Sequence, residues 1–241
     1  MITVIFATYN GSDSLPLMLE ALTKIIPPQG GWKLVAVDNA STDNSHEILT
    51  NYLPKLPLTI LSETQQGKNS ALNTGLKAIE GDLVVFTDDD IKLTDGVTEA
   101  LTEFTESDCD VATFICLNEK NELRRKFSPV PFVHNKRSLF AVGTVEVMIN
   151  VDKIRHSPSR FPVNMGAGQY LSVGDEPVFL ARCLNYGCRI LYFPIPIVCH
   201  PQESSGSELK TNGSLEARGL AVKEVFGRPV GFLALLLFSI K

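Results

Sequence analysis

The sequence predicts an α/β fold: a doubly wound, mostly parallel central sheet flanked by helices. Short apolar runs rich in β-branched residues alternate with segments of helical periodicity through the N-terminal part of the chain. Strands and helices in strict succession imply right-handed βαβ units. With 241 residues, 44% of them hydrophobic and 20% charged, the chain is long enough for one large core or two subdomains sharing a sheet.

The N-terminal elements follow one another regularly. The predicted buried parallel strands are Ile2–Ala7, Leu34–Val37, Leu58–Leu61 and Leu83–Phe86, and the predicted helices between them are Leu15–Ile26, Ser45–Leu53 and Lys68–Ile79. Serine, aspartate and asparagine residues suited to helix N-caps precede the first two helices. Pro16 fits the first helical turn, and a Pro-Pro-Gln-Gly-Gly segment ends that helix.

The C-terminal half contains fewer clear elements. Val111–Leu117 and Thr144–Ile149 are predicted strands, and Val178–Asn185 is a predicted helix with Asp175 as its N-cap. Residues 118–138 carry several basic side chains and are predicted to form a mobile surface insertion. We expect residues 1–110 to bind a nucleotide sugar and residues 111–207 to bind the acceptor and carry the catalytic group. Residues 208–241 are expected to form a helical tail.

Charge and cysteine content restrict the class of protein. A net charge of −5 argues against a general nucleic-acid binder, which would need a basic field to neutralise phosphates. The five cysteines form no CxxC pair, which favours free thiols in a reducing cytoplasm. No signal peptide is recognisable at the N-terminus, so we expect a cytoplasmic location.

The apolar stretch Val230–Ile240 allows two interpretations. At about 1.5 Å per residue, a helix of this length is too short for a bilayer core of about 30 Å. Arg218, Lys223 and Arg228 precede it, which favours a helix in peripheral contact with the inner membrane surface. A helix packed on the body of the protein is the alternative.

Polar segments follow all four predicted parallel strands. These segments are Thr8-Tyr9-Asn10, residues 38–43, residues 63–69 and Asp88-Asp89-Asp90. Open α/β sheets bind ligands beyond the carboxyl ends of their strands, so we expect the four segments to line one pocket.

The aspartate triplet predicts a site for a divalent cation. Asp88 and Asp90 lie at i and i+2 of an extended segment and point to one side, whereas Asp89 points away and is expected to bond within the turn. Carboxylate oxygens suit Mn²⁺ or Mg²⁺, whose remaining positions are filled by water and substrate phosphates. Asp38 could accept a hydrogen bond from a base or ribose, and Lys68 begins a helix at an end that favours anions.

Several segments together resemble a family 2 glycosyltransferase of the GT-A fold, of the type that builds bacterial surface polysaccharides. These are VIFATYN, VAVDNASTDNS, GKNSALNTGL, GDLVVFTDDD and GDEPVFLARCLNYGCRILYFP. The resemblance implies that the residues Thr8, Tyr9, Asn10, Asp38, Lys68, Asn69, Asp88 and Asp89 bind the nucleotide. It also implies that Asp88 and Asp90 form the DxD pair, with Asp90 on the metal. Many relatives carry Arg where Leu72 stands, and Lys68 could supply that missing cation.

The resemblance also implies catalytic residues in the second half. The family's Glu-Asp pair aligns with Asp175 and Glu176, so Glu176 occupies the position of the general base, with Asp175 as the alternative. His200 precedes a segment that is similar to the family's mobile segment, from which a histidine can reach the metal or the diphosphate. A packed surface histidine is the other interpretation of His200.

The leading hypothesis is an inverting glycosyltransferase. It would move a sugar from a nucleotide-diphosphate donor, UDP-linked by preference, to a hydroxyl of a saccharide or lipid-linked saccharide acceptor, assisted by Mn²⁺ or Mg²⁺. A catalytically silent nucleotide-sugar-binding subunit is the alternative. A nucleotidyltransferase is disfavoured because the loop after the first strand contains no Arg or Lys.

Overall fold

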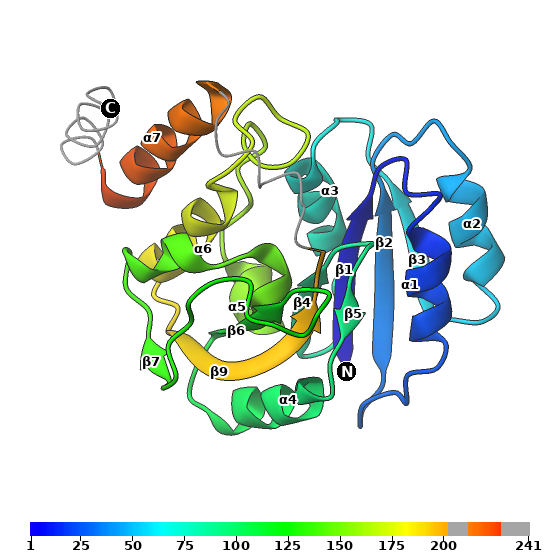
Figure 1. Cartoon of the computed structure of the whole chain (residues 1–241), viewed down its shortest axis with the longest axis horizontal. Helices are drawn as coiled ribbons and strands as arrows, with labels where there is room; N and C mark the ends of the chain where they lie inside the picture. The colour runs from blue at the N-terminus through cyan, green and yellow to red at the C-terminus, as the bar shows by residue number, and fades with distance from the viewer. Residues whose placement is uncertain (202–211, 228–241) are drawn as a thin grey trace.

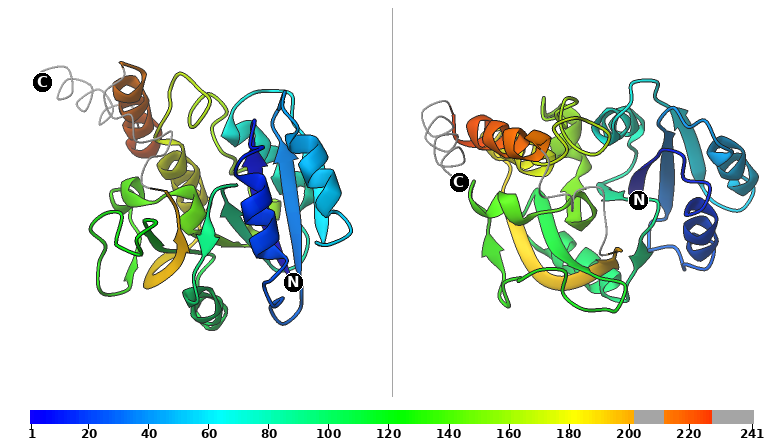
Figure 2. Two further views of the ribbon diagram at one scale, coloured as in Figure 1. Left: turned by 45° about the vertical axis from the view of Figure 1, so that its right-hand side comes forward. Right: turned by 45° about the horizontal axis from the view of Figure 1, so that its top comes forward.

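The computed structural model describes residues 1–201 and 212–227 (Figures 1 and 2). The strands are β1 (Ile2–Thr8), β2 (Trp32–Asp38), β3 (Leu58–Ser62), β4 (Leu83–Thr87), β5 (Lys92–Leu93), β6 (Val111–Leu117), β7 (Phe132–Val133), β8 (Val147–Asn150) and β9 (Ile190–Cys199). The helices are α1 (Leu15–Leu22), α2 (Ser45–Tyr52), α3 (Lys68–Gly75), α4 (Gly96–Glu106), α5 (Val151–His156), α6 (Asp175–Asn185) and α7 (Asn212–Phe226). Short 3₁₀ helices are η1 (Leu76–Ala78), η2 (Ser138–Ala141) and η3 (Thr144–Glu146).

One sheet runs through the molecule in the order β3-β2-β1-β4-β8-β6-β9-β5, and β7 pairs with β9. The strands β3, β2, β1 and β4 are mutually parallel. Beyond β4 the sheet is mixed, because β8 runs antiparallel to both of its neighbours. In the parallel part, Thr8 pairs with Asp38 and Asp38 with Ser62, so the carboxyl ends of three strands lie side by side.

The two faces of the sheet are covered by different helices. Ile5 and Phe6 are consecutive on β1 and fully buried, and they belong to clusters on opposite faces. The Phe6 cluster contains side chains of α1 and α2, and the Ile5 cluster contains side chains of α3 and α6. Burial on both faces explains why the parallel strands are almost continuously apolar in sequence.

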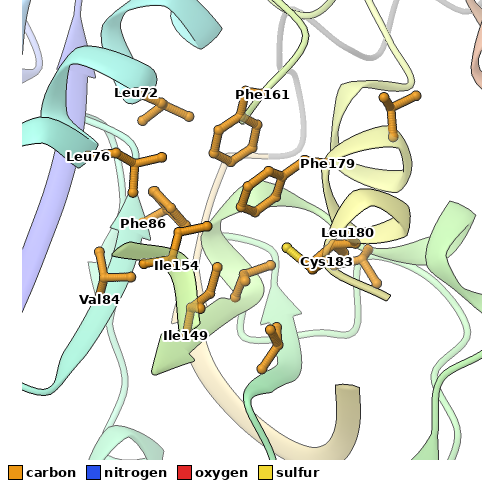
Figure 3. Close-up of a cluster of buried hydrophobic side chains, with 14 of the residues drawn as sticks. Leu72, Leu76, Val84, Phe86, Ile149, Ile154, Phe161, Phe179, Leu180 and Cys183 are labelled. Carbon is orange, nitrogen blue, oxygen red and sulfur yellow. The ribbon is translucent and has the colours of Figure 1, made fainter. Parts of the chain in front are cut away.

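Three aromatic rings connect α6 to the sheet (Figure 3). Phe86 of β4 contacts Phe161 edge-on at 5.2 Å between centroids and Phe179 of α6 at 6.2 Å. Phe161 and Phe179 are stacked at 4.0 Å. The strand that leads into the aspartate triplet is therefore packed against the helix that begins with Asp175.

Several predicted boundaries differ from the structure. The first helix ends at Leu22, and η1 tightens the last turn after α3. The predicted strand Thr144–Ile149 starts as η3 and is extended only from Val147. Helix α6 begins with Asp175 itself, because Gly174 at φ 90° holds the N-cap position. The expectation that Asp175 caps this helix is therefore corrected.

The predicted insertion, residues 118–138, is fastened to the body of the protein. Its strand β7 pairs with β9, and Arg125 forms an ion pair with the buried carboxylate of Glu146. Arg125 is thus paired with a carboxylate and not only solvated. The segment is attached to the sheet, and the prediction of a mobile surface insertion was wrong.

All five cysteines are free, as expected. Within the described residues, the structure contains no helix that is both long and apolar enough to cross a bilayer. The apolar stretch Val230–Ile240 lies outside the described residues.

Candidate functional site

The predicted site residues gather at the carboxyl edge of the parallel strands. Because β1 lies between β2 and β4, the segments that follow these strands meet at one edge. Lys68 begins α3 at the same edge, after Gly67 at φ 122°. Four sequence segments that are far apart along the chain therefore share one site.

Asp88, Asp90 and His200 form a cluster, called here the Asp-Asp-His cluster. One potential ligand atom from each residue lies within 4.8 Å of the other two. His200 Nε2 is 3.3 Å from Asp88 Oδ2 and 3.4 Å from Asp90 Oδ1. Because a carbonyl only accepts, His200 Nδ1 donates to the carbonyl oxygen of Pro201, and Nε2 is the nitrogen that faces the carboxylates. Two carboxylates and one imidazole fit Mn²⁺, whereas Mg²⁺ prefers an all-oxygen set.

Lys68 is a cation next to the Asp-Asp-His cluster. Its Nζ lies 2.5 Å from Asp88 Oδ1. Burial would raise the pKa of Asp88, but Lys68 and His200 hold that pKa well below its usual range, so Asp88 is ionised. Burial would lower the pKa of Lys68, yet the charges of Asp88, Glu176 and Asp175 raise it. Lys68 is thus a cation that faces both the aspartate triplet and the start of α6.

Asp89 has a different partner from the one expected. Its Oδ2 accepts a hydrogen bond of 2.5 Å from Thr8 Oγ1, so it bonds across to β1 and not within its own turn. Gly11 packs against this pair so closely that a Cβ at that position would collide with both side chains. Burial raises the pKa of Asp89 even though the Thr8 bond lowers it. Thr8 and Asp89 together join β1 to the loop after β4.

The residues that follow β1 and β2 form the more exposed part of the site. Asn10 has φ 51°, and its Oδ1 accepts a 2.8 Å hydrogen bond from the backbone of Thr42. Asp38 Oδ1 accepts from the backbone of Ser41 at 3.1 Å, and Asp38 Oδ2 lies 3.3 Å from His46 Nδ1. Tyr9 is exposed beside them. His46 was not foreseen as a site neighbour, because a lone histidine in a helix carries no sequence signal.

Asn69 has a structural role that the sequence did not indicate. It is fully buried, and its Nδ2 donates to the carbonyl oxygens of Pro162 at 3.0 Å and Met165 at 2.8 Å. Asn69 therefore bridges α3 to the loop before α6, while its buried Oδ1 has no hydrogen-bond partner among the described residues. That Asn69 contacts the nucleotide stays a prediction.

The start of α6 lies next to this bridge. A Cβ built on Gly166 would be 2.7 Å from both Asn69 Nδ2 and Asp175 Oδ2, so the absence of a side chain there lets α3 and α6 approach. Asp175 is 4% exposed. Burial and the neighbouring charge of Glu176 raise its pKa. Asp175 is therefore packed inside the junction between the two halves.

Glu176 is more accessible and is held by a hydroxyl. Its Oε1 accepts a 2.8 Å hydrogen bond from Thr144 Oγ1. The turn that contains Thr144 is itself fixed by Glu146, whose Oε2 accepts from the backbone of Gly143 at 3.1 Å and pairs with Arg125. Glu176 also lines a pocket of about 400 Å³. Thr144, Glu146 and Arg125 were missed because these contacts join segments that are distant in sequence.

Solved structures show that this architecture occurs in other proteins. The structure of S. aureus TarS 1-349 in complex with UDP-GlcNAc superposes with a TM-score of 0.74 at 19% identity, covering 99% of this chain and 71% of that one. The mannosyltransferase PcManGT from Pyrobaculum calidifontis, in complex with GDP-Man and Mn²⁺, superposes with a TM-score of 0.64 at 19% identity, covering 99% and 68%. These similarities confirm the α/β fold class predicted from the sequence.

Sequence relatives point to the same family. An undecaprenyl-phosphate 4-deoxy-4-formamido-L-arabinose transferase of Pectobacterium atrosepticum is 29% identical over 134 residues, which are 53% of this chain and 40% of the relative. The protein of the same name from Yersinia pestis is 28% identical over 131 residues, 52% of this chain and 39% of the relative. The chain thus matches about two fifths of the length of these relatives. The family model "Glycosyl transferase family 2" matches residues 3–154, and the chain therefore belongs to this family.

Proposed function

We propose that this protein is an inverting glycosyltransferase that moves a sugar from a UDP-sugar to a hydroxyl of a saccharide or lipid-linked acceptor. The observation that carries the proposal is the position of Lys68 between two sets of groups. Its Nζ pairs with Asp88 of the Asp-Asp-His cluster, and the charges of Asp175 and Glu176 act on it from the start of α6. The Asp-Asp-His cluster with its metal, together with Lys68, suits the negative charge of a diphosphate. The two carboxylates at the start of α6 suit removal of a proton from an acceptor hydroxyl.

The donor is assigned to the edge formed by β1, β2 and β4. Asn10, Tyr9 and Asp38 bind the base and ribose, and Thr8 and Asp89 act behind them by holding two loops together. The TarS complex with UDP-GlcNAc and the PcManGT complex with GDP-Man support a nucleotide-sugar donor, and the TarS complex supports UDP as the nucleotide. The curated relatives, named for undecaprenyl phosphate, support a lipid-linked acceptor.

The Asp-Asp-His cluster is assigned to the metal. Asp88, Asp90 and His200 would hold Mn²⁺, or Mg²⁺ as the second choice, which when bound neutralises charge on the leaving diphosphate. Lys68 supplies a fixed positive charge at the start of α3, at the end of a helix that favours anions. Its pair with Asp88 keeps that charge at the site in the absence of donor.

The general base is assigned to Glu176. Its carboxylate takes the proton of the acceptor hydroxyl while the acceptor oxygen forms a bond to the anomeric carbon. The bond from that carbon to the diphosphate oxygen breaks on the opposite face, which inverts the configuration. Glu176 is favoured over Asp175 because it is the more accessible carboxylate, lines the pocket and is oriented by Thr144. Asp175, buried against Gly166, is assigned to support of the junction.

A screen for thermal stabilisation tests this function directly. The full-length protein is heated with a panel of UDP- and GDP-sugars, each with and without Mn²⁺, because a ligand that binds only the folded state raises the apparent stability. The proposal expects one UDP-sugar to stabilise the protein, and more strongly with Mn²⁺. The same donor should then be hydrolysed or transferred. Binding without turnover on several acceptors would favour a silent subunit, and no binding at all would remove the proposal.

A further inference from the structure

The pocket beside Glu176 lies outside the donor edge. It is formed where α6 contacts η2 and α7, and Figures 1 and 2 show α7 beside α6 at the far side from β2 and β3. Its described lining is Phe140, Val142, Val173, Gly174, Glu176, Pro177, Arg218 and Val222. Phe140 of η2 stacks on Phe226 of α7 at 6.0 Å, which fixes the distance between these two walls. None of the residues assigned to the donor belongs to this lining.

The lining is mostly apolar and contains two side chains of opposite charge. A volume of about 400 Å³ falls in the range of small-molecule sites. An apolar wall such as that of Phe140, Val142 and Val222 offers few hydrogen-bond partners for a bare saccharide. It fits instead a ligand whose surface is partly hydrocarbon, because burying that surface is favourable.

Arg218 is the cation of this pocket and is available for a ligand. Its side chain is half-buried on the wall formed by α7. Over residues 1–201 and 212–227, its guanidinium forms no ion pair or hydrogen bond, whereas Arg125 and Arg189 each pair with a carboxylate. A guanidinium suits phosphate oxygens because it presents several donors in one plane.

We propose that this pocket binds the acceptor and that the acceptor is a saccharide linked through phosphate to a lipid. The lipid phosphate lies on Arg218, the first hydrocarbon units lie on Phe140, Val142 and Val222, and the reacting sugar hydroxyl reaches Glu176. The phosphate belongs at the Arg218 end because the carboxylate of Glu176 repels an anion. This inference rests on the proposed function and deepens it by placing the lipid-linked acceptor in this pocket and naming Arg218 as the residue that binds its phosphate.

Farnesyl phosphate, kept below its micelle concentration, is the probe for this pocket. Its binding to the full-length protein is measured by isothermal titration calorimetry, with farnesol and inorganic phosphate as the two partial ligands. We expect farnesyl phosphate to bind more tightly than either, because each partial ligand uses only one of the two features. Arg218→Gln should weaken farnesyl phosphate binding by about 10- to 100-fold, the range for a hydrogen bond to a charged group, and should leave farnesol binding unchanged.

Lys223→Gln is the matched control. Lys223 lies on the same helix, is exposed and does not line the pocket, so its replacement removes the same charge without changing the site. Equal loss of farnesyl phosphate binding in both variants would show a general charge effect and overturn the assignment. Inorganic phosphate binding as tightly as farnesyl phosphate would make this a simple anion site, and no binding of farnesyl phosphate would also overturn it.

Donor binding separates this inference from the proposed function. Arg218→Gln should bind the UDP-sugar and Mn²⁺ as the unmodified protein does, because Arg218 is outside the donor edge. If the unmodified protein binds no nucleotide sugar, the proposed function fails. If it binds the donor normally but farnesyl phosphate binding does not depend on Arg218, only the pocket assignment fails.

Discussion

The three consecutive aspartates after β4 have different partners. Asp88 faces Lys68 and His200, Asp90 faces His200, and Asp89 bonds to Thr8. The alternation of an extended segment separates the two outer residues from the central one. The outer aspartates can therefore hold a cation while the central aspartate ties two loops together.

Replacing these aspartates should separate the two roles. Asp90→Ala should lower the affinity for Mn²⁺ in the presence of donor by about 100-fold or more, because even indirect partners of a metal are worth 10- to 100-fold. Asp89→Ala should instead lower the free energy of unfolding by about 1–3 kcal/mol, because Thr8 keeps a buried hydroxyl without its partner. Calorimetric metal titration and urea unfolding measure the two effects. Full Mn²⁺-dependent transfer by Asp90→Ala would contradict the metal assignment.

The base assignment gives a prediction for Glu176. Glu176→Gln should lower kcat for transfer by about 100- to 10,000-fold, the usual contribution of a general base, with donor affinity unchanged. The bond from Thr144 should persist, because the amide oxygen of glutamine also accepts. Asp175→Asn is the comparison, and steady-state kinetics of both variants decide which carboxylate acts. A larger loss of kcat in Asp175→Asn would transfer the role to Asp175.

At the scale of elements, α6 depends on its contact with β4. Phe179 packs against both Phe161 and Phe86, with 1% of its surface exposed. Phe179→Ala should lower the free energy of unfolding by about 3–5 kcal/mol, the range for removing a buried aromatic ring. Asn185→Ala, at an exposed position in the last turn of the same helix, is the control for urea unfolding. Similar losses in both variants would show that the aromatic cluster does not anchor α6.

The segment after β7 contains a buried histidine that should make stability depend on pH. His134 accepts from Thr113 at 2.7 Å through Nε2 and donates to Ser138 at 2.9 Å through Nδ1, because Ser138 itself donates to Asn135. Burial lowers the pKa of His134 to about 4. The unfolded histidine, with a pKa of about 6.5, therefore takes up a proton at a higher pH than the folded one.

The sign of the effect follows from this difference in pKa. As the pH falls below about 6.5, the unfolded state gains a proton that the folded state does not bind, so stability decreases until the pH approaches 4. Between pH 7 and pH 5 this amounts to about 2 kcal/mol. Urea unfolding of the unmodified protein and His134→Gln over this range measures the difference in slope. Parallel curves for the two proteins would contradict a neutral buried His134.

At the scale of the whole molecule, the parallel half was predictable and the mixed half was less so. Strands such as Ile2–Thr8 are apolar throughout because both faces are covered, and their ends carry the polar residues. The sequence also placed Asp88, Asp90 and His200 near one another through the family resemblance. The two-residue strands β5 and β7 were not predicted, because their placement depends on β9 and not on local pattern. The helix Gly96–Glu106 was also missed, although Val97, Ala100, Leu101 and Phe104 follow a helical spacing.

The polar contacts of the site were the least predictable feature. His46 on Asp38, Thr144 on Glu176 and Arg125 on Glu146 each join segments that no local pattern connects. Asn69 was expected to bind the nucleotide because the segment GKNSALNTGL resembles the family. Its amide nitrogen donates to two carbonyl groups, and only the tertiary packing around Gly166 reveals these contacts.

The two predicted halves share one core, so we expect them to unfold together. The largest buried cluster contains Ile5 and Val35 of the first half together with Phe179 and Ile190 of the second. A true domain has its own core, so these halves should not unfold separately. We expect differential scanning calorimetry to show one transition, whose calorimetric and van't Hoff enthalpies agree. A UDP-sugar with Mn²⁺ should move that whole transition to higher temperature. Two transitions, with only the first shifted by the donor, would show that residues 1–110 form an independent nucleotide-binding domain.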